Sequence, residues 1–173
     1  PLCGRNFEYY SEDPLLAGVL AGAMVKGIQS QGVAATVKHF ALNNKETDRK
    51  HSDSRVSERA AREIYLKAFE YVIKGAKPWA VMSSYNIING CYASENKELL
   101  EDILRDEWGF DGMVTTDWWT LGEHYKEVKA GNDMKMACGD PKRLKEAMDQ
   151  GLLTRQDLEH CAERVLNLIL KLD

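Results

Sequence analysis

The sequence predicts an α/β fold made of parallel β/α units. Short apolar runs alternate with amphipathic helical patterns along the chain, which is typical of such units. The apolar runs lack a polar face, as strands buried on both sides of a parallel sheet do. The 173 residues leave room for about four units, whereas a complete (β/α)8 barrel usually needs about 250 residues. A small doubly wound sheet and half of a barrel are therefore the two alternatives.

The first half of the chain predicts two helices separated by one strand. We expect a loop, a helix, a strand, a long polar loop and a second helix at residues 1–14, 14–31, 33–40, 41–56 and 57–74. Ser11 or Asp13 can cap the first helix, and Gly32 suits its exit. Small residues along this helix indicate close packing against a neighbour, and Ser57 can cap the second helix.

The second half of the chain repeats the pattern. We expect strands at 79–86, 112–118 and 133–136, a loop at 87–95, and helices at 96–107, 121–130, 141–150 and 154–172. In the helix at 96–107 four apolar residues share one face and are expected to point inward: Leu99, Leu100, Ile103 and Leu104. Thr154 is the expected cap of the last helix.

Composition excludes several classes of function. Hydrophobic residues make up 44% and charged residues 29%, which is ordinary for a globular protein. The net charge is −4 without a basic stripe, so we expect no nucleic-acid partner. No apolar run is long enough for a membrane span, so we expect no membrane partner either. Four widely spaced cysteines indicate buried free thiols rather than a zinc site or disulfides, and we expect no metal and no cofactor.

The first residue is Pro1, and neither an initiator Met nor a signal peptide is present. The chain is therefore expected to be processed or to be a piece of something longer. On the absent signal segment we expect a cytoplasmic location.

Three predicted strands end in titratable or aromatic residues, where parallel α/β folds place their working groups. These ends hold Lys38 and His39, Tyr85 and Asn86, and Asp117 followed by two tryptophans. Asp117 is either a helix N-cap after the strand, or a nucleophile or base beside an aromatic platform that suits a sugar ring.

Lys38 and His39 have structural alternatives as well. Lys38 could pair with a carboxylate, and His39 could be a core histidine. Neighbours in a strand point to opposite faces unless the backbone bends. Basic residues at 45–55 alternate with acidic ones and predict a salt-bridged loop. A nucleotide-binding domain is disfavoured because no glycine-rich phosphate loop follows a strand.

Four motifs in order resemble glycoside hydrolase family three, the β-glucosidase and β-xylosidase family. They are GRNFEYYSEDP at 4–14, KHFALNN at 38–44, MSSYN at 82–86 and GFDGMVTTDW at 109–118, with GNDM at 131–134 fitting the last barrel strand. The resemblance covers nearly the whole chain. It implies that residues 1–173 form part of the catalytic barrel domain, namely the second half of a TIM-type (β/α)8 barrel.

The resemblance also implies a retaining β-glycosidase that hydrolyses terminal non-reducing β-D-glycosyl residues through a covalent glycosyl-enzyme. Asp117 takes the position of the nucleophile. Arg5, Lys38 and His39 take positions that bind hydroxyls of the sugar, Met82 and Tyr85 line that subsite, and Trp118 supplies its aromatic wall. The expected partner is a small β-glycoside or an oligosaccharide.

The same resemblance identifies what this chain lacks. The family's acid/base carboxylate belongs to a separate α/β sandwich domain, and a sugar-gripping aspartate lies on an earlier barrel strand. We therefore expect a complementary fragment or a second copy of the chain to complete the barrel, because an open half-barrel exposes strand edges. The alternative is a non-catalytic carbohydrate-binding or assembly fragment derived from this family.

Overall fold

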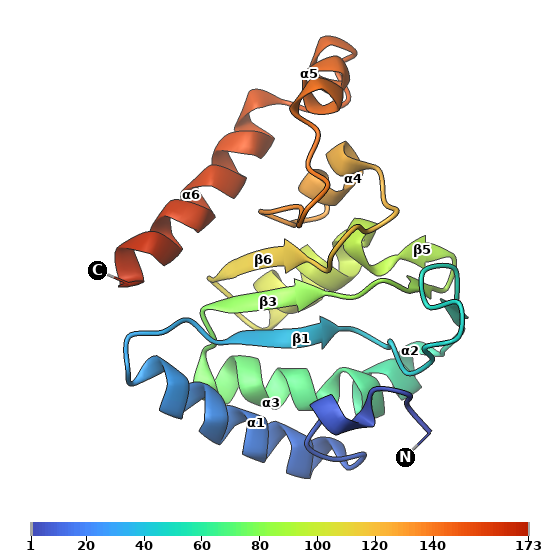
Figure 1. The fold of residues 1–173 in the computed structure, drawn as a ribbon, viewed down its shortest axis with the longest axis vertical. Coiled ribbons are helices and arrows are strands. Elements are labelled where there is room, and N and C mark those ends of the chain that lie inside the picture. The colour runs from blue at the N-terminus through green and yellow to red at the C-terminus, as the bar shows by residue number, and fades with distance from the viewer. Residues whose placement is uncertain (1, 173) are drawn as a thin grey trace.

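The computed structural model describes residues 2–172 and shows a parallel sheet with helices packed around it (Figure 1). The helical elements are η1 (Asn6–Glu8), α1 (Pro14–Gln29), α2 (Glu58–Ala60), η2 (Ala61–Tyr65), α3 (Lys67–Ala76), η3 (Ala93–Glu95), η4 (Glu98–Glu107), α4 (His124–Lys129), α5 (Pro141–Asp149) and α6 (Arg155–Leu172). The strands are β1 (Thr36–Phe40), β2 (Asp53–Ser54), β3 (Ala80–Ser83), β4 (Ile87–Ile88), β5 (Cys91–Tyr92) and β6 (Met113–Thr116).

The main sheet has the order β1-β3-β6, and its neighbouring strands are parallel, as predicted. The carboxyl ends of the three strands therefore lie along one edge. A second small sheet, β2-β4-β5, forms within two segments that the sequence predicted as loops. The register between β1 and β3 shifts between Val37 and Phe40. The Lys38–His39 and Phe40–Ala41 peptide bonds are cis.

The predicted fourth strand at 133–136 is wrong as a strand, because within the described residues it forms only a parallel bridge between Thr115 and Met134. Two side chains replace the backbone partners that a longer ladder would need. The Asp133 carboxylate accepts the Val114 N–H at 2.7 Å, and the Thr116 hydroxyl accepts the Met136 N–H at 3.0 Å.

The expected caps and packing of the first helix are confirmed. The Asp13 carboxylate accepts the Leu16 N–H at 2.8 Å, and Gly32 follows the helix with a φ of 71°. Helix α1 packs against α3, and Gly18 lies at the contact: a Cβ added there would lie 2.8 Å from the Cβ of Tyr71. Only a residue without a side chain lets the two helices approach this closely.

The next two predicted helices form with irregular geometry. The helix that begins after Ser57 divides into α2, the π-helical η2 and α3, and the Ser57 hydroxyl caps it by accepting the Ala60 N–H at 3.3 Å. Element η4 is also π-helical. Its four predicted inward residues are buried, as expected: Leu99, Leu100, Ile103 and Leu104. The Thr154 hydroxyl accepts the Asp157 N–H at 3.2 Å, which confirms Thr154 as the cap of α6.

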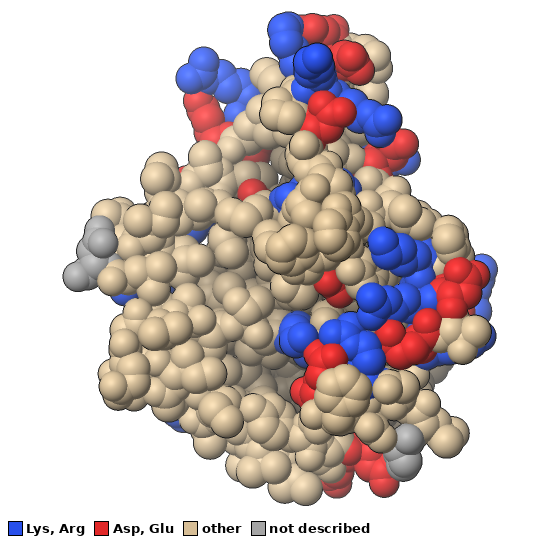
Figure 2. Space-filling view, viewed as in Figure 1, with Lys and Arg blue, Asp and Glu red and all other residues tan. Residues whose placement is uncertain are grey.

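Burial of β1 on both faces was a wrong prediction. Thr36 and Lys38 are exposed on one face of the strand, whereas Val37 packs against the helical cluster of Val25 and Val72 on the other. Among the described residues β1 pairs with β3 alone, so its other edge is also open. The helices α1 and α6 also carry uncovered apolar faces. Exposed apolar side chains lie on α1 (Leu15, Leu16, Val19, Leu20, Met24) and on α6 (Leu166, Ile169, Leu170, Leu172). On the face shown in Figure 2, charged side chains gather over the strand ends and α5, while the left of the same view carries few.

Candidate active site

Asp117 follows β6 at the carboxyl edge of the sheet and is almost fully buried, with 5% of the residue exposed. Its Oδ1 accepts the Trp118 N–H at 2.7 Å. Its Oδ2 makes no hydrogen bond of normal geometry among residues 2–172, although the Tyr85 hydroxyl interacts with the Asp117 carboxylate. A turn rather than a helix follows, so Asp117 is not a helix N-cap. A buried carboxylate oxygen without a donor is costly, and such an atom is a candidate for contact with a ligand.

His39 approaches this free oxygen from β1. Its Nε2 lies 3.6 Å from Oδ2 of Asp117, and its Nδ1 lies 2.7 Å from the Tyr9 hydroxyl. Burial lowers the pKa of His39 to about 4, although the Asp117 charge acts in the opposite direction. His39 is therefore neutral near pH 7. A neutral imidazole that accepts the Tyr9 hydroxyl proton at Nδ1 carries its own proton at Nε2, on the side of Asp117.

Lys38 and Arg5 meet on a carboxylate that the sequence analysis did not single out. Glu8 Oε2 lies 2.6 Å from Lys38 Nζ, and the Arg5 guanidinium bonds both Glu8 oxygens, at 2.6 and 2.8 Å. Hydrogen bonds from Arg5 and then Lys38 lower the pKa of Glu8 to about 2. The carboxylate that the two cations hold ionised is thus Glu8, which fixes them beside the strand end.

The irregular register of β1 explains how adjacent residues serve one site. Lys38 reaches Glu8 and His39 reaches Tyr9, so both contact the same N-terminal loop. The alternation expected for a regular strand does not hold here, since the register shifts between Val37 and Phe40. Glu8 and Tyr9 lie inside the motif at 4–14, and that motif was the signal that could have identified them.

Tyr85 follows β3 in the chain, two residues after the strand ends, and is 7% exposed. Burial and then the negative charge of Asp117 raise the pKa of Tyr85 to about 12. The Arg49 guanidinium lies 4.7 Å from the centre of its ring and the Lys50 ammonium 5.1 Å. The loop at 45–55 is salt-bridged as predicted, with Arg49 and Glu46 3.0 Å apart. Its second role, covering Tyr85 with two cations, was missed.

The aromatic residues after Asp117 are accessible. Trp118 and Trp119 are 43% and 55% exposed, and their ring centres lie 5.4 Å apart. Met82 is half-buried on β3, in register with Thr115 of β6. The structure therefore brings Arg5, Lys38, His39, Tyr85, Asp117 and Trp118 to the carboxyl ends of the strands, and contact of any of these residues or of Met82 with a sugar stays a prediction.

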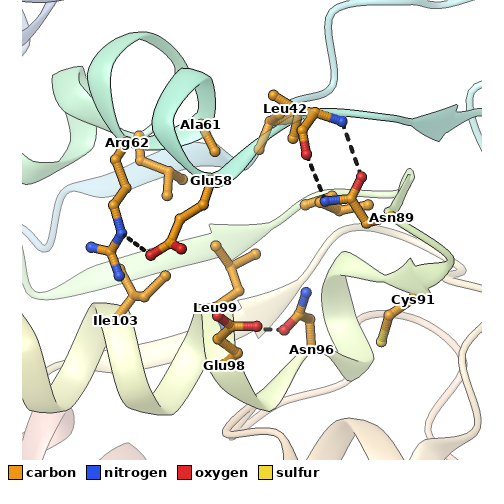
Figure 3. A pocket seen from close by; sticks show the side chains of 13 residues that line it. Leu42, Glu58, Ala61, Arg62, Asn89, Cys91, Asn96, Glu98, Leu99 and Ile103 are labelled. Atoms are coloured by element: carbon orange, nitrogen blue, oxygen red, sulfur yellow. Dashed lines mark hydrogen bonds and ion pairs between the residues drawn. The ribbon is translucent and has the colours of Figure 1, made fainter.

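A cavity of about 270 Å³ lies apart from the strand ends that carry these residues (Figure 3). Apolar side chains such as Leu42 and Leu99 line it, together with the ion pair of Arg62 and Glu58. It contains none of the predicted site residues. Among the described residues no group of His, Cys, Asp or Glu could hold a metal ion, and no helix is long and apolar enough to cross a membrane. All four cysteines are free, as expected, but the expected burial is wrong for Cys3, Cys91 and Cys138, which are partly exposed, and holds for Cys161 alone.

The family model of the Glycosyl hydrolase family 3 N terminal domain matches residues 1–168. This chain belongs to glycosyl hydrolase family 3. Beta-glucosidase A of Butyrivibrio fibrisolvens is 65% identical over 159 residues, which cover 92% of this chain and 19% of the relative. An exo-alpha-(1->6)-L-arabinopyranosidase of Bifidobacterium longum is 47% identical, over 99% of this chain and 23% of the relative.

Solved structures of the family have the same fold. Beta-glucosidase 3B from Thermotoga neapolitana in complex with glucose superposes with a TM-score of 0.95 at 48% identity, covering 99% of this chain and 25% of that one. The predicted family and α/β barrel fold class are thereby confirmed. This family 3 chain spans about a fifth to a quarter of the length of these relatives.

Proposed function

We propose that this chain carries the nucleophile side of a retaining β-glycosidase that removes terminal non-reducing β-D-glycosyl residues, with glucose as the first candidate sugar. The observation that carries the proposal is the unpartnered, buried Oδ2 of Asp117 at the sheet edge. Relatives named β-glucosidases and a related structure in complex with glucose support the choice of sugar.

In the proposed reaction Oδ2 of Asp117 attacks the anomeric carbon, and the bond from that carbon to the leaving oxygen breaks. A general acid protonates the leaving oxygen. Water then attacks the anomeric carbon of the glycosyl-enzyme and loses a proton to the same acid/base residue, so the carboxylate of Asp117 is released. Oδ1 is held by the Trp118 N–H, which leaves Oδ2 as the oxygen that reacts.

The surrounding groups suit an oxocarbenium-like transition state. A neutral His39 can bond a hydroxyl without neutralising Asp117, and the negative charge of Asp117 then stays available to the developing positive charge on the sugar. Arg5 and Lys38, held by Glu8, present donors to hydroxyls, and Trp118 offers an apolar face to the ring.

We propose that the general acid and the missing β/α units come from outside residues 1–173. The open edge of β1 and the apolar faces of α1 and α6 support this, since such surfaces are normally covered. Additional units of a longer chain, a complementary fragment or a second copy would each cover them.

Removal of the nucleophile tests the proposal. Asp117→Gly is expected to lower hydrolysis of an aryl β-glucoside with a good leaving group by about 10³-fold or more. Added azide should restore product as the α-glycosyl azide, because azide attacks from the face that Asp117 vacates. Asp111→Asn is the matched control, since Asp111 belongs to the same motif and its side chain is 81% exposed.

Azide rescue with the β configuration would overturn the role of Asp117, because it would identify Asp117 as the acid/base. Unchanged hydrolysis in the Asp117→Gly variant would overturn it as well. Sugar binding without any turnover by the wild type would favour the alternative, a carbohydrate-binding or assembly fragment.

A further inference from the structure

A buried ion pair lies behind the segment that carries Asp117. The Lys135 ammonium bonds the Glu127 carboxylate, and the two side chains are 6% and 1% exposed. Lys135 Nζ also donates to the Thr120 hydroxyl and to the carbonyl of Gly122, each at 3.0 Å. An ammonium has three protons, and these three acceptors use all of them.

The two loop acceptors place Lys135 at the far end of the segment 117–122. The chain at the start of this segment is bonded to the backbone on either side of Lys135. Thr116 N donates to the carbonyl of Met134 at 2.9 Å, and Trp119 N donates to the carbonyl of Met136 at 3.3 Å. Residues 134–136 therefore form hydrogen bonds to the chain on both sides of Asp117 and Trp118. The side chain of Lys135 adds the bonds to Thr120 and Gly122.

The partner of Lys135 is itself fixed to the sheet. The Ser94 hydroxyl donates to Oε1 of Glu127 at 2.8 Å, and Asn132 donates to the carbonyl of Ser94 at 2.6 Å. The Ser83 hydroxyl donates to Asn132 at 2.9 Å, while the carbonyl of Ser83 accepts the Asp117 N–H at 3.2 Å. The network thus starts at Lys135 and ends at Ser83 of β3, whose carbonyl bonds Asp117.

We propose that Lys135 is a positioning residue that sets the segment 117–122, and with it Oδ2 of Asp117 and the face of Trp118. The inference rests on the proposed function, because that function gives the segment its nucleophile. The competing explanation is a buried ion pair that only stabilises the fold. Displacement of a reacting group by about 1 Å costs about 100-fold in rate, so a positioning role has a measurable kinetic signature.

The double variant Glu127→Gln with Lys135→Met separates the two explanations. Lys135→Met alone leaves Glu127 buried without its cation and is expected to lower both stability and function. In the double variant that uncompensated charge is gone, so stability returns. The Thr120 hydroxyl and the carbonyl of Gly122 still lack their donor, so a positioning defect persists.

Arg105→Met is the matched control. Arg105 forms a comparably buried ion pair with Asp133 at 2.9 Å, with side chains 7% and 0% exposed. Its other bonds go to the carbonyls of Gly112 and Gly131, at 2.9 and 3.2 Å, ahead of β6 and away from 117–122. Loss of this pair removes a buried interaction without touching the segment.

The experiment uses the 173-residue chain and its three variants. We would measure urea unfolding, the maximal rate of covalent labelling by an activated 2-deoxy-2-fluoro β-glucoside, and hydrogen exchange of the peptide that covers 117–123. We expect Lys135→Met and the double variant to label about 10- to 100-fold more slowly, and to exchange faster in this peptide, although the double variant unfolds like the wild type. Arg105→Met is expected to label within about twofold of the wild type.

Recovery of both labelling and exchange in the double variant would overturn the positioning role, as would equal losses in Arg105→Met. A wild-type chain that binds the sugar and still does not label contradicts the proposed function instead. In that case exchange still decides the inference: faster exchange at 117–123 in the double variant supports it, and unchanged exchange overturns it.

Discussion

Nε2 of His39 and Oδ2 of Asp117 lie 3.6 Å apart across the carboxyl edge of the sheet, with β3 between their two strands. This separation is too long for a hydrogen bond and short enough for one sugar hydroxyl to meet both groups. A hydroxyl bound between them would therefore meet the unpartnered Oδ2 of Asp117 on one side and the neutral imidazole of His39 on the other.

His39 predicts acid sensitivity of folding. Its pKa falls from 6.5 to about 4 on folding, so between these values the unfolded chain binds more protons. Stability is therefore expected to fall as the pH drops from 6.5 to 4, by at most about 3 kcal/mol. Urea unfolding of the wild type and of His39→Gln at pH 7, 5 and 4 checks this. The His39→Gln variant should not lose stability in this way between pH 6.5 and 4. The control His160→Gln, at an exposed residue, should lose stability like the wild type. Equal acid sensitivity in His39→Gln would contradict the assignment.

Glu8 is predicted to organise the two cations. Glu8→Gln removes the charge that Arg5 and Lys38 share, and we expect labelling by the activated fluoro-glycoside to slow by about tenfold at pH 7. Glu63→Gln is the control, since Glu63 pairs with Arg59 at an exposed helical site. The folded pKa of Glu8 is about 2, so its contribution to stability is lost as the pH falls from about 4.5 toward 2. Labelling of Glu8→Gln at the wild-type rate would refute the role.

Two glycines of α1 predict opposite effects of the same substitution. A Cβ at Gly18 lies 2.8 Å from the Cβ of Tyr71, whereas a Cβ at Gly27 meets nothing within 4 Å. Gly18→Ala should destabilise the chain by about 1–3 kcal/mol through overpacking. Gly27→Ala should stabilise it by about 0.5–1 kcal/mol, because alanine favours the helix. Thermal and urea unfolding measure both, and a stable Gly18→Ala variant would contradict the α1–α3 contact.

The open flank of α1 predicts association of the isolated chain. Val19 and Leu16 are 58% and 50% exposed, and burial of such a surface favours contact with another molecule. Light scattering should give a mass above the 19.6 kDa monomer, and Val19→Lys with Leu16→Lys should lower it. Leu152→Lys is the control, since Leu152 is exposed outside this flank. A clean wild-type monomer at every concentration would count against an uncovered flank.

Much of the fold was predictable, because periodicity and caps are local. Asp13 and Ser57 cap the helices as predicted, and the parallel order followed from alternation of strands and helices. Burial of β1 was not predictable, since it depends on what lies beyond the strand. The strand at 133–136 failed because the side chains of Asp133 and Thr116 take the place of backbone partners.

The candidate site was predictable to a similar extent. Strand ends pointed to Lys38, His39 and Asp117, and all three lie at one edge. That edge also brings Glu8 to Lys38 and Arg49 to Tyr85, which are pairings between loops far apart in the sequence. Such pairings follow from the folded topology, and no spacing in the chain encodes them.

The most direct test is the intact mass of the chain after incubation with an activated 2-deoxy-2-fluoro β-glucoside. Its good leaving group needs little acid assistance, so a missing general acid does not mask a competent nucleophile. We expect a single glycosyl adduct on the peptide that contains Asp117, retained in Asp111→Asn and lost in Asp117→Asn. An adduct on another residue, or one of equal yield in Asp117→Asn, would contradict it.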